Sequence, residues 1–195
     1  MEVKYSPKTY RFARDVVGFA MKIVFRPNIE GIENIPQEGP FILAGNHKSL
    51  LDIPLVAMAS KKDIRFIAKE ELFHNKLAGN TLTKLGAIPI KRNQADFKAI
   101  RTSIDVLKKG NILGIFPEGT RQKGEALGQF KAGASVLALK GNCPIIPFGI
   151  SGEYKIGKSI TIRFGEAISI NKEDVKANRA DSQLQEQVKK LVYQK

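Results

Sequence analysis

Two residues of this chain, His47 and Asp52, have the types and the spacing for proton transfer. They stand in the run NHKSLLD, residues 46–52. A histidine can act as a general base near neutral pH, and a carboxylate on its other ring nitrogen fixes the tautomer. Because five positions on a regular helix are about 140° apart, the pair works only if His47 lies in a turn and Asp52 reaches back from a helix. The structural alternative is that Asn46 or Ser49 caps the helix and Asp52 favours its positive end.

A second cluster, FPEGTR at residues 116–121, has the composition of an anion-binding turn. Its proline and glycine predict a turn at the end of a strand. Arg121 carries a planar guanidinium whose donors fit a phosphate, and the backbone amides of Gly119 and Thr120 could contact an anion. Taken alone, the cluster is better explained as a strand-to-loop turn with solvated charges.

A third cluster, GAIPIKR at residues 86–92, places the adjacent cations Lys91 and Arg92 at the end of a strand pattern. Such a pair can bind phosphate, although by itself it is usually surface charge. His74 is the only other histidine and Cys143 the only cysteine. No group of residues has the spacing of metal ligands, so we expect no metal. The single cysteine excludes an internal disulfide framework.

The segments around these clusters alternate between two periodicities. Short apolar runs predict buried strands at residues 41–44, 64–68, 87–90, 112–116, 145–150 and 159–164. Helical spacing and stop signals predict helices at residues 50–59, 95–109, 130–140 and 181–193. This alternation predicts an α/β fold, a mixed and mostly parallel sheet covered by helices. In such folds, sites gather at the carboxyl ends of the strands.

The first 26 residues predict a basic amphipathic helix that ends before Pro27, with Pro7 breaking it or starting a second helix. A sector of about 120° holds charged residues, namely Lys4, Lys8, Arg11, Arg14, Asp15, Lys22 and Arg26. The other side is apolar, with Phe12, Val16, Val17, Phe19, Ala20, Ile23 and Val24. The apolar face either packs on the core or lies in a bilayer interface, and this segment alone leaves both open. We find no secretory signal and no run of about 20 apolar residues that could span a membrane.

The charge balance indicates an anionic partner. The chain has 195 residues, of which 43% are hydrophobic, and this fits one globular domain. Its 32 Lys and Arg against 19 Asp and Glu give a formal net charge of +13. Nucleic acid, an anionic membrane, a phosphorylated substrate and an acidic carrier protein would each match that excess.

The clusters, in this order, resemble the motifs of the glycerolipid acyltransferase family, and its lysophosphatidic acid acyltransferases are the closest match. His47 and Asp52 match the first motif, a histidine and an aspartate separated by four residues. The other matching segments are GAIPIKR (86–92), FPEGTR (116–121), FKAGA (130–134) and PIIP (144–147). The resemblance covers residues 27–170. Two departures, Gln122 and Cys143, fall where we expect no chemistry.

The resemblance implies transfer of a fatty acyl group from a thioester to the free sn-2 hydroxyl of lysophosphatidic acid, which makes phosphatidic acid. It implies that His47 is the general base and that Asp52 orients it, without an acyl-enzyme. Residues expected at the substrate phosphate are Lys91, Arg92, Glu118, Gly119 and Arg121. Glu118 could instead shape the turn or contact the glycerol. We expect no cofactor, with acyl-coenzyme A or acyl carrier protein bringing the acyl group as co-substrate.

The amphipathic pattern and the resemblance together divide the chain into a membrane-surface helix, residues 1–26, and an acyltransferase domain, residues 27–195. The expected partners are an anionic membrane surface, a lysophospholipid acceptor and the acyl donor. The expected location is peripheral or monotopic on the cytoplasmic face of the cell membrane.

Two alternatives remain open at this point. A member of the same family could act on glycerol 3-phosphate or another lyso-lipid. A protein of another class could bind anionic lipid or nucleic acid without catalysis, although His47, Asp52 and Arg121 would then be idle. The sequence contains no recognised nucleic-acid motif, so we expect no nucleic-acid partner.

Overall fold

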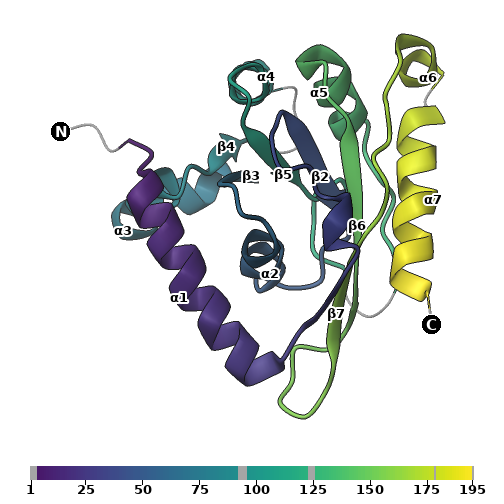
Figure 1. Cartoon of the computed structure of the whole chain (residues 1–195). Coiled ribbons are helices and arrows are strands. Elements are labelled where there is room, and N and C mark those ends of the chain that lie inside the picture. The colour runs from purple at the N-terminus through teal and green to yellow at the C-terminus, as the bar shows by residue number, and fades with distance from the viewer. Residues whose placement is uncertain (1–3, 92–95, 123–125, 178, 195) are drawn as a thin grey trace.

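A mixed sheet forms the centre of the molecule (Figure 1). The computed structural model describes residues 4–91, 96–122, 126–177 and 179–194. Within these ranges the strands are β1 (Asn28–Glu30), β2 (Phe41–Gly45), β3 (Ile64–Lys69), β4 (Ile88–Ile90), β5 (Ile112–Ile115), β6 (Ile145–Gly152) and β7 (Ile160–Phe164). Their order across the sheet is β1-β7-β6-β2-β5-β3-β4. The β6–β7 pair is antiparallel and every other pair is parallel, which confirms the predicted fold class.

Helices cover both faces of this sheet. They are α1 (Pro7–Phe25), α2 (Asp52–Ala59), α3 (Lys76–Lys84), α4 (Phe97–Lys108), α5 (Gly133–Gly141), α6 (Lys172–Lys176) and α7 (Arg179–Tyr193). Figure 1 shows α1 and α2 on one side of the sheet and α4, α5 and α7 on the other. The strands therefore have no solvent-facing side over most of their length, as expected for a mostly parallel sheet.

The central strand β2 shows why the core has two layers. All five of its residues are buried. Phe41 and Leu43 point into the layer that contains Leu55 of α2, whereas Ile42 and Ala44 point into the layer that contains Ala138 of α5. Successive side chains of a strand face opposite sides, so one apolar run fills both layers and holds the end of β2 in a fixed position.

The predicted strands and helices are confirmed, with ends shifted by a few residues, but β1, α3 and α6 were missed. Within α3 only Gly79 is buried, and its nine residues are too few for apolar spacing to predict a helix. Its start did carry a signal, because the Asn75 side chain accepts hydrogen bonds from the Leu77 and Ala78 amides. The short α6 buries no residue at all.

The N-terminal helix begins at Pro7, which occupies its first turn behind the Ser6 cap. Pro7 therefore starts the helix rather than breaking it, and Lys4 precedes the helix instead of joining its charged side. Arg14 also departs from the expected pattern. Its guanidinium turns inward and donates to the carbonyls of Ser60 and Lys61, at 3.4 and 3.2 Å.

The contact that α1 makes with the domain is narrow. Tyr10, Gly18 and Met21 are its buried residues, and a methyl group on Gly18 would lie 3.1 Å from Met58 Cβ of α2. The broad apolar side points away from the core, with Phe12 72% and Phe19 67% exposed. Packing of this side on the core, one of the two alternatives, is therefore wrong.

None of the helices in the part of the chain that the structure describes is both long and apolar enough to cross a bilayer.

Gly45, the last residue of β2, is a position where the fold leaves no room for a side chain. A Cβ there would overlap the Phe148 carbonyl oxygen and ring of β6. We expect Gly45→Ala to lower the free energy of unfolding by about 3 kcal/mol, because a backbone carbonyl cannot move aside cheaply. Chemical denaturation measures this change.

Gly133→Ala is the matched control, because a Cβ at Gly133 meets nothing within 4 Å. We expect it to leave stability unchanged or to raise it by about 0.5 kcal/mol. Equal losses in the two variants would contradict the close approach of β2 and β6.

Candidate active site

Three segments meet where β2, β5 and β6 end. These strands are adjacent and parallel, so their carboxyl ends lie at one edge of the sheet. The turn 46–51 follows β2, the turn 116–122 follows β5, and the connection 153–159 follows β6. The first two segments are the clusters that the sequence singled out, and the third carried no signal.

His47 and Asp52 lie in direct contact. His47 Nδ1 is 2.8 Å from Asp52 Oδ2, and Asp52 is the first residue of α2. The same oxygen accepts hydrogen bonds from the backbone amides of Lys48 at 2.6 Å and Ser49 at 2.8 Å. An oxygen that serves as acceptor for two amides is also the acceptor for the imidazole, so Nδ1 carries the hydrogen. The lone pair of a neutral ring then lies on Nε2. A turn histidine and a helical aspartate are the arrangement that the spacing required.

The helix-capping alternative holds only in part: Asp52 does lie in the first turn of α2, but neither Asn46 nor Ser49 caps the helix. Asn46 is buried and bonds the backbone of Ile150 in both directions, donating to its carbonyl at 2.9 Å and accepting from its amide at 2.7 Å. Ser49 Oγ accepts from the Leu51 amide at 3.2 Å. The residue at the cap of α2 is Leu51, which makes no capping bond through its side chain. Asn46 instead holds the ends of β2 and β6 together below His47.

The second oxygen of Asp52 has a partner of its own. Tyr154 donates its hydroxyl to Asp52 Oδ1 at 2.7 Å, so four donors surround a carboxylate that is fully buried. Burial, followed by the negative charge of Asp52, raises the pKa of Tyr154 far above its usual value. The hydroxyl therefore keeps its proton and remains a donor. No sequence pattern indicated this contact, because Tyr154 is distant from Asp52 in the chain and belongs to no motif.

The turn after β5 packs against the His47 ring. The rings of His47 and Phe116 are stacked with centroids 4.0 Å apart and an angle of 18° between their planes. The Gln122 amide donates to the His47 carbonyl at 2.8 Å. Gln122, one of the two departures from the family pattern, contributes its backbone here, which many residue types could supply.

Glu118 is placed to shape this turn. Its side chain is buried, with 4% of the residue exposed, and Oε1 accepts from the Gly128 amide at 3.4 Å. Burial raises the pKa of Glu118 to about 7, and backbone hydrogen bonds partly offset that rise. A buried carboxylate is a poor ligand for a phosphate, so the geometry favours the turn-shaping role over the phosphate contact.

Gly119 allows the backbone conformation of the turn, and its amide is not a free hydrogen-bond donor. Its φ of 70° lies in the left-handed region, which favours glycine, and its amide already donates to the Phe116 carbonyl at 3.0 Å. The expected amide contact between Gly119 and a phosphate is therefore not available in this structure. Lys131 lies close by, since a methyl group on Gly119 would stand 3.4 Å from Lys131 Nζ. Lys131 belongs to the segment FKAGA (130–134), which matched the family pattern, but no role was predicted for it.

The expected phosphate-binding cations do not form one group. Arg121 is exposed and adjoins Gln122, so it lies beside the His47 turn. Lys91 follows β4, three strands along the sheet from β2, which corresponds to about 14 Å. Lys91 Nζ is 3.9 Å from Glu70 Oε1. Arg92 lies outside the described residues.

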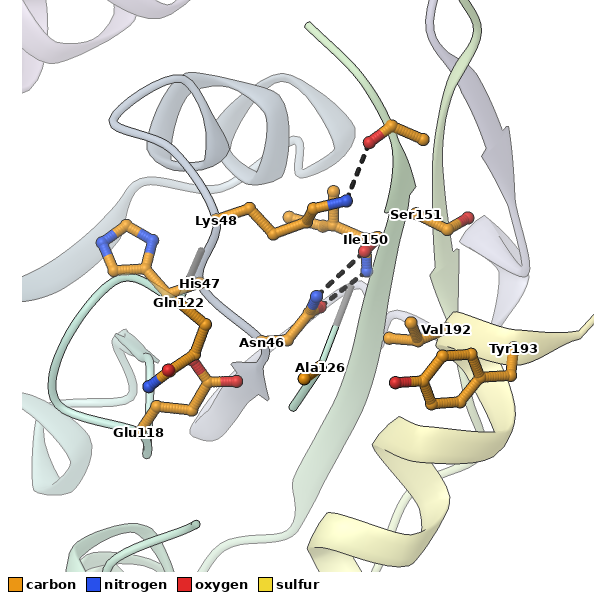
Figure 2. Close-up of a pocket in the computed structure, with 11 residues that line it drawn as sticks. Asn46, His47, Lys48, Glu118, Gln122, Ala126, Ile150, Ser151, Val192 and Tyr193 are labelled. Atoms are coloured by element: carbon orange, nitrogen blue, oxygen red, sulfur yellow. Dashed lines mark hydrogen bonds between the residues drawn. The ribbon is translucent and has the colours of Figure 1, made fainter. Parts of the chain in front are cut away.

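A pocket opens between these segments and the end of α7. Figure 2 shows His47 and Glu118 on one side of it and Tyr193 on the other, with Ser151 at its rim. The Lys48 ammonium donates to the Gly152 carbonyl at 2.8 Å, within the same pocket (Figure 2). Among the described residues, no group of three or more His, Cys, Asp or Glu is placed to hold a metal ion.

Known proteins share both the sequence pattern and the fold. The 1-acyl-sn-glycerol-3-phosphate acyltransferase of Bacillus subtilis is 31% identical over 144 residues, which are 73% of this chain and 71% of that protein. The chloroplastic 1-acyl-sn-glycerol-3-phosphate acyltransferase LPAT1 of Arabidopsis thaliana is 32% identical over 163 residues, which are 80% of this chain and 46% of that protein. The chain thus spans about half the length of its chloroplast relatives.

A solved structure agrees with these matches. The crystal structure of the 1-acyl-sn-glycerophosphate (LPA) acyltransferase PlsC from Thermotoga maritima superposes with a TM-score of 0.71 at 27% identity, covering 95% of this chain and 77% of that one. Residues 26–151 also match the family model described as Acyltransferase. The chain therefore belongs to the acyltransferase family, as its ordered motifs predicted.

Proposed function

We propose that this chain transfers a fatty acyl group from an acyl thioester to the free sn-2 hydroxyl of lysophosphatidic acid, forming phosphatidic acid. The observation that carries the proposal is the 2.8 Å contact between His47 Nδ1 and the fully buried Asp52. This contact leaves His47 Nε2 as the proton acceptor. Relatives named for this reaction support the choice of substrate.

In the proposed mechanism His47 is the general base. Nε2 takes the proton of the acceptor hydroxyl while its oxygen attacks the thioester carbonyl. Asp52, held by four donors, keeps the ring in one orientation and offsets the positive charge that it gains. When the tetrahedral intermediate collapses, the thiolate leaves and takes the proton from Nε2. Acceptor and donor thus exchange one acyl group for one proton, and no acyl-enzyme forms.

Recognition of the acceptor phosphate falls to the cations beside the His47 turn. Arg121 offers a fork of donors, and Lys131 adds a positive charge next to Gly119. Lys91 stays in the proposal as a cation at the same edge of the sheet, further from His47. Arg92, outside the described residues, stays in it on the sequence pattern alone. The acyl donor is coenzyme A or acyl carrier protein, both acidic, and the net charge of +13 favours either. No cofactor is required.

The helix α1 is proposed to lie on an anionic bilayer, where the acceptor resides. The apolar side chains that face away from the domain, Phe12, Val16, Phe19 and Ile23, are between 51% and 72% exposed. Exposed cations adjoin them, including Lys8, Lys22 and Arg26. Each cation near an anionic surface contributes about 1 kcal/mol, and burial of the apolar side chains adds to this. We therefore propose that the protein binds at the membrane surface, on the cytoplasmic face.

The first test is acyl transfer by wild type and His47→Ala on vesicles that contain lysophosphatidic acid, with thiol release from acyl-coenzyme A as the readout. We expect His47→Ala to lower kcat by about 10³-fold or more, because general base catalysis is lost. His74→Ala is the matched control, since His74 is exposed and lies outside the site. Activity that survives in a folded His47→Ala would contradict the mechanism.

The role of Arg121 predicts a difference between two acceptors. We expect Arg121→Ala to raise the KM for lysophosphatidic acid about tenfold, since a hydrogen bond to a charged group is lost. The KM for a lyso-ornithine lipid, which has no phosphate, should not change. Arg179→Ala, at the far end of α7 from the pocket, is the control. Equal losses with both acceptors would remove the phosphate-binding role, and wild-type preference for the ornithine lipid would replace the proposed acceptor.

The membrane proposal predicts a position-dependent loss of vesicle binding. We expect Phe12→Ser combined with Phe19→Ser to weaken co-sedimentation with anionic vesicles by about tenfold or more, because two large apolar side chains no longer enter the interface. Phe97→Ser is the matched control, since Phe97 is 78% exposed but lies in α4 on the other side of the sheet. Equal binding by the double variant and wild type would mean that the membrane-binding surface is not on α1.

A further inference from the structure

The hydrogen bond between Tyr154 and Asp52 joins segments that no motif connects. Tyr154 stands just after β6, in the connection to β7, and its hydroxyl reaches Asp52 Oδ1 at 2.7 Å. The other oxygen, Oδ2, serves His47 and the amides of Lys48 and Ser49. Tyr154 is thus the one donor to Oδ1 among the described residues.

This bond controls the orientation of the carboxylate. The donors to Oδ2 hold one oxygen but leave the group free to rotate around it, and a partner on Oδ1 fixes the second oxygen. Because Asp52 is fully buried, water cannot readily replace Tyr154 if its hydroxyl is lost. The carboxylate would then have an unpaired oxygen and a looser bond to His47 Nδ1.

The ring of Tyr154 is itself held by the end of α1. The Phe25 and Tyr154 rings meet edge to face, with centroids 5.7 Å apart and an angle of 85°. Phe25 is the last residue of α1, and both rings are partly buried against the core cluster that contains Leu55 of α2. The helix with the exposed apolar side therefore contacts the catalytic pair through two side chains, Phe25 and Tyr154.

We propose that Tyr154 is a positioning residue for the His47–Asp52 pair and that Phe25 holds Tyr154 in place, so that α1 supports the geometry of the catalytic base. The inference rests on the proposed function for its effect on turnover. Its effect on the Nδ1 hydrogen bond of His47 can be measured without turnover.

Tyr154→Phe is the direct test, since it keeps the ring against Phe25 and removes the hydroxyl. We expect kcat to fall about tenfold, because a hydrogen bond to a buried charge is lost. The KM for the lipid acceptor should stay within about twofold, because Tyr154 acts on Asp52 and not on the substrate. In proton NMR, the His47 Nδ1 proton should exchange with water about tenfold faster or more, as the bond that protects it opens more often. The chain has two histidines, so His74→Gln assigns the signals.

Ser135→Ala is the matched control for loss of stability. It also removes a buried hydroxyl that donates to an aspartate, here Asp181 at 2.6 Å, but on the side of the sheet that α5 and α7 cover. We expect kcat and the Nδ1 exchange rate to remain at wild-type values. Loss of turnover in Ser135→Ala equal to that in Tyr154→Phe would reduce the role of Tyr154 to general stability and overturn the proposal.

Phe25→Ala tests the link to α1. It should lower kcat by about threefold in the wild-type background and by nothing further in the Tyr154→Phe background, because both changes act through one bond. Additive losses would overturn the link. Wild-type kcat and an unchanged Nδ1 exchange rate in Tyr154→Phe would overturn the positioning role. If wild type shows no turnover, the proposed function fails, and the exchange rates still decide the inference.

Discussion

The burial of the Asp52 carboxylate is the constraint on which the rest of the site depends. A charge removed from water is strongly destabilising unless donors replace its hydration. Four donors do so here, and they come from the imidazole, two amides of the turn and the hydroxyl of Tyr154. Once these four hydrogen bonds form, the turn after β2 has little conformational freedom. The orientation of the buried carboxylate then sets the direction of His47 Nε2.

That arrangement needs strands whose ends are held closely. Gly45 lets β2 approach Phe148 of β6, and Asn46 then bonds the Ile150 backbone in both directions. Phe116, just after β5, stacks on the imidazole ring of His47. Because three parallel strands end at one edge, segments separated by a hundred residues reach the same site. The sheet thus supplies a precision that no single loop would have.

The sequence predicted those parts of the site that are local in the chain. Spacing placed His47 in a turn and Asp52 on a helix, since five positions cannot share one helical face. Apolar runs predicted the strands, because burial on both faces leaves a nearly continuous hydrophobic pattern. Tyr154 could not be predicted, because its contact depends on how β6 pairs with β7. One part of the prediction for Gly119 was wrong. The turn requires a glycine, but the Gly119 amide donates a hydrogen bond within that turn and is not free to contact a phosphate.

For the N-terminal helix too, the sequence did not show which residues contact the rest of the domain. A helical wheel states which residues share a face but not which face the domain covers, and α1 has three faces rather than two. Gly18 has no side chain, so α1 packs closely on α2 along a narrow strip that also buries Met21. The wide apolar side containing Phe12 and Phe19 remains exposed. An exposed apolar patch favours association with another apolar surface. For an enzyme proposed to act on a lipid, we propose the bilayer as that surface. A helix that binds it while touching Tyr154 through Phe25 would join the place where the acceptor is found to the pair that activates it.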